Sequence, residues 1–386
     1  MCPLEVNENV TLNWDNVQRA INAQGLFLEQ RVDGLMQEWQ TLLDQVAERP
    51  DHLYFTGCGD SFYCGLAAEW AALEWAGVDA WAVEALEWSR YRVRHIPSGG
   101  SAWMVAVSNS GRVSRTVEAL RQARRHGLRG FAVTYREDSD LARSADHVLP
   151  YRYDDPGFGP GTLSYTASLS SLLALVLALG RRAGTLTPAA SAAVLKQTHA
   201  LGRAIPELVE QSQAVAAQLL VDFPPPWPYL CMVGGGPNYA TAQFGMAKMI
   251  ESARHSTVAQ QLEEWAHEQY FCTQPGTLTV LMVPPGQSHD RGLEQLRAIR
   301  DVGGRAIVLA ASSDRDARES ADYFVPMPDT TSDEEALTPL VYGVPLQVLA
   351  MSYARATGST MLGFDDPHRM QVNFRQIFSS ALTEDA

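Results

Sequence analysis

Hydrophobic positions along this chain change their spacing many times, and the changes predict alternating helices and strands. Residues 13–48 carry apolar side chains at helical spacing, which predicts one or two amphipathic helices with a break near Gly25. From Leu53 onward, short runs rich in β-branched and aromatic residues alternate with amphipathic stretches. That order is typical of βαβ units around a parallel sheet. The strands expected in this first part cover residues 53–56, 81–84, 102–107, 130–134 and 146–149.

The same order begins again after a proline-rich junction at residues 223–228. Proline lacks a backbone donor and fixes φ, so this run should end the long helical block that precedes it. The repeated pattern indicates an internal duplication. Further strands are expected at residues 229–233, 278–283, 305–310 and 323–326. We therefore expect an α/β chain of four parts: an N-terminal helical segment (1–48), a first domain with linking helices (49–222), a second domain (223–360) and a C-terminal tail (361–386).

The composition, with 46% hydrophobic and 19% charged residues, is that of a soluble globular protein. A net charge of -14, with no basic cluster on any predicted element, argues against a nucleic-acid partner. The longest apolar run, around residues 172–180, is short and ends at two arginines, so we expect no membrane span. The five cysteines are scattered and no secretory signal is visible, which predicts reduced thiols in a cytoplasmic protein. Neither histidines nor cysteines show metal-ligand spacing, so no metal is expected.

Two turns of the first half could bind an anion, because each follows a predicted strand and opens a helix whose first N–H groups are unpaired. They cover residues 57–61 and 108–112, and the second is rich in small donors. Both turns could equally be helix caps. Asp60 would repel a phosphate unless it caps its own helix or faces a sugar hydroxyl; Arg112 and Arg115 could offset its charge or be ordinary surface residues. The first turn lacks the third glycine of a dinucleotide fingerprint, so no nicotinamide cofactor is expected.

Lys248 and Glu251 are three residues apart in a predicted helix, and His267 follows in a later segment. Side chains at this spacing share one helix face, so an ammonium would lie beside a carboxylate. A base, a cation and an imidazole are what proton transfer next to a carbonyl requires. The alternative is a solvated surface pair without a catalytic role. Cys58 begins a helix, yet packing of a small buried side chain is the better interpretation.

In the order and spacing of these motifs, the chain resembles the tandem sugar isomerase (SIS) domain family, and in particular the isomerase half of glucosamine-6-phosphate synthase. The resemblance spans about residues 53–371. It implies two doubly wound, flavodoxin-like parallel-sheet domains that bind phosphorylated sugars. The segments that carry it are residues 57–61, 83–88, 108–111, 245–251, 263–267 and 344–350.

The resemblance also implies roles for particular residues. Glu251 matches the base that moves a proton between C1 and C2, Lys248 its neighbouring lysine, and His267 the ring-opening histidine, which in the family comes from the neighbouring subunit. A homodimer follows from that arrangement, and no cofactor is implied. The substrate-binding residues expected on this basis are Gly59, Asp60, Ser61, Ser108, Asn109, Ser110, Gly111 and Thr166.

The chain departs from the family pattern at several positions. Val113 stands where a threonine completes the phosphate loop, Ala167 replaces a lysine beside Thr166, and Val372 aligns with the closing lysine of the tail. Phe244 replaces a glutamate one turn before Lys248. No amidotransferase half matches, so we expect no glutamine-dependent amination by this chain.

The expected function is that of a phosphosugar isomerase-type enzyme acting through an enediol. An aminosugar-phosphate deaminase or a ketosamine-phosphate deglycase uses the same step, and a non-catalytic sugar-phosphate sensor is a further alternative. The expected partner is a phosphorylated sugar or aminosugar.

Overall fold

The computed structural model describes residues 12–96, 101–330 and 332–382, and it contains two five-stranded parallel sheets. The first has the order β2-β1-β3-β4-β5 and the second the order β10-β9-β8-β6-β7. Both are the flavodoxin-like doubly wound order, so the predicted fold class and the predicted duplication are confirmed. The strands are β1 His52–Gly57, β2 Asp79–Glu84, β3 Ala102–Val107, β4 Arg129–Thr134, β5 His147–Pro150, β6 Leu230–Gly234, β7 Thr257–Gln261, β8 Leu278–Val283, β9 Arg305–Ala311 and β10 Tyr323–Met327.

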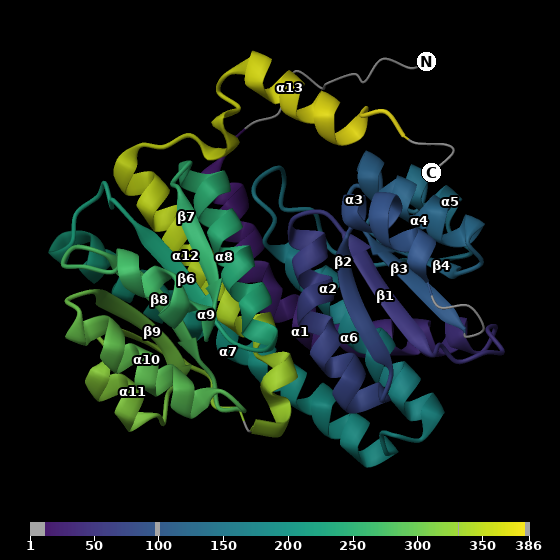
Figure 1. Cartoon of the computed structure of the whole chain (residues 1–386), viewed down its shortest axis with the longest axis horizontal. Helices are drawn as coiled ribbons and strands as arrows, with labels where there is room; N and C mark the ends of the chain where they lie inside the picture. The colour runs from purple at the N-terminus through teal and green to yellow at the C-terminus, as the bar shows by residue number, and fades with distance from the viewer. Residues whose placement is uncertain (1–11, 97–100, 331, 383–386) are drawn as a thin grey trace.

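The central strands read as continuous apolar runs because helices cover both faces of each sheet, whereas the edge strands β2 and β7 carry polar residues. Every residue of β8 is buried, for example. Long helices pack together with one another and join the two halves, and α2 of the first half lies against α8 of the second (Figure 1). The main helices are α1 Trp14–Leu43, α2 Asp60–Ala71, α4 Ser114–Arg125, α6 Leu163–Ala183, α7 Pro188–Asp222, α8 Pro237–Ala253, α10 His289–Asp301 and α12 Pro339–Thr357.

Shorter helical segments cap the strand ends, and the C-terminal tail forms a helix that lies across the top of the molecule in Figure 1. The domain boundaries expected from the sequence stay a prediction. The shorter segments are η1 Ala72–Ala76, α3 Ala85–Glu87, η2 Trp88–Arg92, η3 Val93–His95, α5 Asp140–Ser144, α9 Glu264–His267, η4 Gln269–Cys272, α11 Arg315–Ser320, η5 Ser332–Leu337, η6 Met361–Gly363 and α13 Pro367–Phe378.

The break expected near Gly25 does not exist, because α1 is one continuous helix of 30 residues. Gly25 has a packing role instead. A Cβ added there would lie 2.7 Å from the carbonyl oxygen of Gly202 on α7, and a Cβ on Gly202 would lie 2.8 Å from the carbonyl of Gly25. The two glycines let α1 and α7 approach closely, which explains a glycine inside a helix despite its intrinsic cost.

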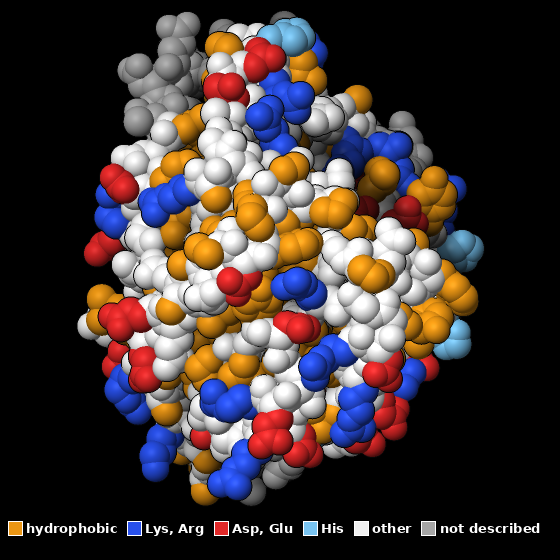
Figure 2. Space-filling model, turned by 90° about the vertical axis from the view of Figure 1, so that its left-hand side faces the viewer, with side chains coloured by type: hydrophobic (Ala, Val, Ile, Leu, Met, Phe, Trp, Pro, Cys, Tyr) orange, Lys and Arg blue, Asp and Glu red, His pale blue; other side chains and the backbone are white. Residues whose placement is uncertain are grey.

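Two helices are apolar over a longer stretch than the sequence analysis expected. Among the described residues, the segments Leu163–Ala183 and Glu334–Thr357 have the length and composition of a membrane span, so the expectation that no run is long enough was wrong. In both segments 94% of the most apolar window is buried inside the protein, as is usual for core helices. The outer face of the second half has hydrophobic side chains gathered at its centre and charges of both signs interspersed around them (Figure 2).

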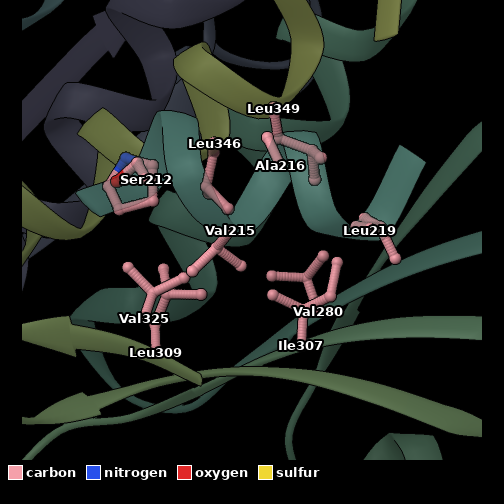
Figure 3. Close-up of a pocket in the computed structure, with 11 residues that line it drawn as sticks. Ser212, Val215, Ala216, Leu219, Val280, Ile307, Leu309, Val325, Leu346 and Leu349 are labelled. Carbon is pink, nitrogen blue, oxygen red and sulfur yellow. The ribbon is translucent and has the colours of Figure 1, made fainter. Parts of the chain in front are cut away.

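A small apolar cavity lies between α7, α12 and the second sheet (Figure 3). Its volume is about 20 Å³, and the side chains that point into it include Val215, Leu346 and Val280. Such a space holds at most one water, and its apolar lining gives a water no partner. It is a packing defect of the core, so a sugar-sized ligand must bind elsewhere.

Candidate active site

Lys248 lies at the contact between the two halves. It is on α8, and its side chain is only 1% exposed. Its Nζ donates to Oε2 of Glu251, one turn further along α8, at 2.5 Å. The same Nζ donates to Oδ2 of Asp60, in the first turn of α2, at 2.7 Å. A surface pair would leave Lys248 in solvent, so burial of its ammonium between two carboxylates removes the solvated alternative.

Burial and charge act against each other in this cluster. Burial raises the pKa of Glu251 to about 7, although the Lys248 ammonium opposes the shift. Burial likewise raises the pKa of Asp60, against the pull of the same ammonium. Burial alone would lower the pKa of Lys248, but the two carboxylates outweigh it and raise that pKa above its ordinary value. Lys248 therefore stays charged near neutrality, while Glu251 can both take and release a proton.

The loop before α6 brings Gly161 against the carboxylate of Asp60. A Cβ added at Gly161 would collide with Oδ2 of Asp60, so only glycine permits this approach. The same loop lines an open cavity of about 270 Å³, large enough for part of a phosphorylated sugar. Asn109, Tyr135 and Tyr153 line it from the other side. The cavity thus extends from the turn after β3 to the residues that touch Asp60.

The turn between β3 and α4 is held rigidly by its own hydrogen bonds. The backbone N–H of Gly111 donates to Ser108 Oγ at 3.1 Å, and Tyr151 and Tyr153 donate their hydroxyls to Asn109 Oδ1 at 3.1 and 3.0 Å. Gly111 has φ +61°, and a side chain there would collide with Ser139. Ser110 Oγ accepts from the backbone N–H of Arg112 at 3.3 Å. A preformed turn of this kind can present its donors to an anion without reordering.

The two arginines that could have offset Asp60 contact the C-terminal tail instead. The Arg112 guanidinium lies 5.3 Å from the centre of the Phe378 ring at the end of α13. Arg115 pairs with Glu118 and also donates to Ser380 and to the carbonyl of Ala381. Asp60 is compensated by Lys248, a partner 188 positions away that sequence reasoning did not assign to it.

The second half contains a matching pair of turns with a carboxylate of its own between them. Gly236 before α8 has φ +52° and Gly59 before α2 has φ +55°, so the two halves use the same turn. Glu335 lies between that turn and the turn after β8, where its Oε2 accepts from the N–H of Gln287 at 3.0 Å. Gly286 packs directly against this carboxylate. In the second half, therefore, an anion occupies the position that corresponds to the predicted anion site of the first.

Two of the predicted site residues lie apart from this cluster within one chain. The side chain of His267, on α9, is 65% exposed, and it pairs with Glu263 at 3.5 Å. No hydrogen bond or ion pair among the described residues joins His267 to Lys248 or Glu251. Thr166 is buried in α6, where its hydroxyl donates to Gln24 at 2.6 Å, and this contact gives no support to a role in substrate binding.

Gly59 and Ser61 flank Asp60 at the start of α2, as expected from the sequence. Burial raises the pKa of Cys58 to about 12, so this thiol is not a reactive one.

Sequence reasoning missed Gly161, Tyr153 and Glu335. A glycine-rich stretch at residues 157–161 was the only signal for the first of them.

Comparison with known proteins shows which family and which fold this chain resembles. Residues 48–178 match the SIS domain family. Glutamine--fructose-6-phosphate aminotransferase [isomerizing] of Mycobacterium bovis is 29% identical over 327 residues, which are 83% of this chain and 50% of that protein. The chain thus spans about half the length of the curated relatives it matches.

Solved structures share the fold over both halves. The C-terminal domain of glucosamine-fructose-6-phosphate aminotransferase from Francisella tularensis has a TM-score of 0.77 at 19% identity, covering 90% of this chain and 97% of that one. Glucosamine-6-phosphate deaminase from Thermotoga maritima has a TM-score of 0.69 at 18% identity, covering 89% and 96%. At these identities the likeness concerns the fold alone.

Proposed function

Because residues 48–178 form a SIS domain and a second sheet repeats its topology, we propose that this chain is a phosphosugar isomerase-type enzyme. It moves a proton between C1 and C2 of a sugar phosphate or aminosugar phosphate through an enediol. The observation that carries the proposal is the buried Lys248 ammonium held by Glu251, whose pKa is raised to about 7. A carboxyl with that pKa is matched to accept and return a proton at neutral pH.

Each group in the site has a distinct task in this reaction. Glu251 removes the proton next to the carbonyl and returns it to the neighbouring carbon, so the reaction is redox-neutral. Lys248 holds Glu251 in place and lies near the oxygen on which charge develops. The turn at residues 108–111, with Ser61, binds the phosphate. His267 opens the sugar ring in the site of a second subunit.

Proton exchange is the direct test of this function. The protein is incubated in D₂O with glucose, fructose and glucosamine 6-phosphates, and loss of the C1 and C2 proton signals is followed by NMR. Enzyme-dependent exchange in at least one of these sugars is expected. If every tested sugar phosphate binds but none exchanges, the protein is a sensor.

A deaminase or deglycase that releases an amine is the second candidate, because it begins with the same proton transfer. One solved structure of the same fold is called a glucosamine-6-phosphate deaminase. Detection of free ammonia or a free amine during turnover distinguishes this reaction from isomerisation. The sensor alternative is weaker, since ligand binding alone needs no buried base.

The phosphate turn gives a prediction of its own. Changing Ser108 and Ser110 together to Ala should weaken the binding of a phosphorylated sugar by several kcal/mol, because each charge-assisted hydrogen bond contributes about 1.5–3 kcal/mol. Titration calorimetry with the phosphorylated and unphosphorylated sugar measures the difference. The matched control changes Ser312 and Ser313, which bond to Asp329 in the second half, and should bind normally. Equal affinity of the wild type for both sugars would mean that the turn only caps its helix.

We place the protein in the cytoplasm as a homodimer. Large apolar side chains remain exposed on a single chain, such as Phe271 at 78% and Trp81 at 46%. Phe271 follows His267 in the segment after β7, an edge strand of its sheet. Contact of this region with a second copy would bury apolar surface and bring His267 to the partner's site.

Mixing two inactive variants tests the shared site. Glu251→Gln and His267→Ala should each be inactive alone, yet regain activity when unfolded together and reassembled. A hybrid dimer contains one site with an intact Glu251 from one chain and an intact His267 from the other. Native mass spectrometry verifies the hybrids. If verified hybrids remain inactive, each chain builds its site from its own residues.

A further inference from the structure

The cluster around Lys248 contains more negative than positive charge. One ammonium contacts two carboxylates, Asp60 and Glu251. When Glu251 is in the ionised form that can act as a base, the three side chains together carry one uncompensated negative charge. Their side chains are 1%, 21% and 31% exposed, for Lys248, Asp60 and Glu251 respectively. Negative charge that is partly removed from water in this way is costly unless a partner compensates it.

Asp60 is also only half satisfied. Its Oδ2 accepts from Lys248, whereas its Oδ1 is buried and accepts no hydrogen bond from any described residue. A carboxylate oxygen without a donor is an acceptor that a ligand can use. Gly161, which lines the cavity, lies against Oδ2 of the same carboxylate, so the cavity ends one residue away from Asp60.

The charge balance matters for the reaction as well as for binding. An enediol step develops negative charge on the substrate, and a cation that is already shared by two carboxylates stabilises such charge poorly. A substrate that brings its own positive charge removes this difficulty. Asp60 and Glu251 touch the same nitrogen atom, so a positive group near Asp60 lies close to the carbon on which Glu251 acts.

From these contacts we propose that Asp60 selects an ammonium-bearing sugar phosphate over its hydroxyl-bearing counterpart. The ammonium stands on C2 of an aldose phosphate or on C1 of a ketose phosphate. The Asp60 carboxylate accepts its hydrogen bond, and the ligand's charge makes the cluster neutral. This inference rests on the proposed function, because it assumes that the sugar phosphate binds between the turn at residues 108–111 and Lys248.

Titration calorimetry with matched ligands tests the selection. Glucosamine 6-phosphate and glucose 6-phosphate differ only at C2, and 1-amino-1-deoxyfructose 6-phosphate and fructose 6-phosphate differ only at C1. At least one amine should bind the wild type more than tenfold better than its hydroxyl counterpart. Asp60→Asn should abolish that preference, mainly by weakening the amine. The pair that shows the preference identifies the carbon that carries the ammonium.

Controls separate a specific contact from a general effect of charge. Asp155→Asn removes a carboxylate that lines the same cavity but bonds to Gly157, so the preference should persist. Asp60→Ser, with folding checked by thermal melting, provides a second variant if Asp60→Asn is unstable. Binding of amine and hydroxyl ligands with equal affinity by the wild type overturns this inference while leaving the proposed function intact. Failure of all four ligands to bind contradicts the proposed function itself.

Discussion

Replacing Glu251 by Gln should slow turnover by about 10²–10⁴-fold, the usual cost of losing a general base, while ligand affinity changes by no more than a few fold. The amide keeps the shape of the side chain and can still contact Lys248, but it cannot take a proton. Exchange of the C2 proton with D₂O, measured by NMR, reports the loss directly. Retention of that exchange in the variant would rule out Glu251 as the base.

The pH profile of the wild type is the companion measurement. Because burial raises the pKa of Glu251 to about 7, the carboxylate form disappears as the pH falls through that value. The ratio kcat/KM should therefore fall about tenfold for each pH unit below 7. A profile that stays flat down to pH 5 would show that the base has the pKa of an ordinary carboxyl.

Replacing Lys248 by Met should cost about 3–5 kcal/mol of folding free energy, because it leaves two half-buried carboxylates without their cation. Without the ammonium, burial would raise the pKa of both carboxyls further above the unfolded value. Stability is then retained at low pH, where both are protonated, and is lost as the pH rises through their raised folded-state pKa values. Urea unfolding at pH 5 and pH 8 should show the larger deficit at pH 8.

A variant that lacks all three charges is the control for this prediction. Lys248→Met combined with Asp60→Asn and Glu251→Gln removes all three charges, and it should recover much of the lost stability while remaining inactive. Equal destabilisation of the single and the triple variant would mean that Lys248 stabilises the fold by packing rather than by charge.

The sequence predicted nine of the ten strands of the described residues, and most of these are largely buried apolar runs. It missed β7, whose sequence TVAQQ is partly polar and mostly only half-buried. It failed at Gly25, since the glycine of α1 is explained by a close approach to Gly202 on a helix 177 positions later. Periodicity describes one element at a time and carries no information about which helix will cross it.

For the candidate site, the contact within one helix could be predicted from the sequence, and the contact between two helices could not. Spacing placed Lys248 beside Glu251, and the structure confirms that contact. The contact with Asp60 depends on how α2 packs on α8, so no local pattern could reveal it. Whether His267 belongs to the site stays a prediction, because in a single chain it lies at an exposed edge.

Glu335 makes the two halves chemically different although they share one topology. Two halves with the same topology suggest two ligands per chain. In the second half, however, the carboxylate of Glu335 already lies between the two turns that correspond to the predicted anion site of the first half. Burial raises the pKa of Glu335, so the group is held there at some electrostatic cost. The consequence is a fixed stoichiometry: a titration with a sugar phosphate should saturate at one ligand per chain. If the proposed function is right, the first half binds the ligand, and the second half has no free anion site because Glu335 lies between its two turns.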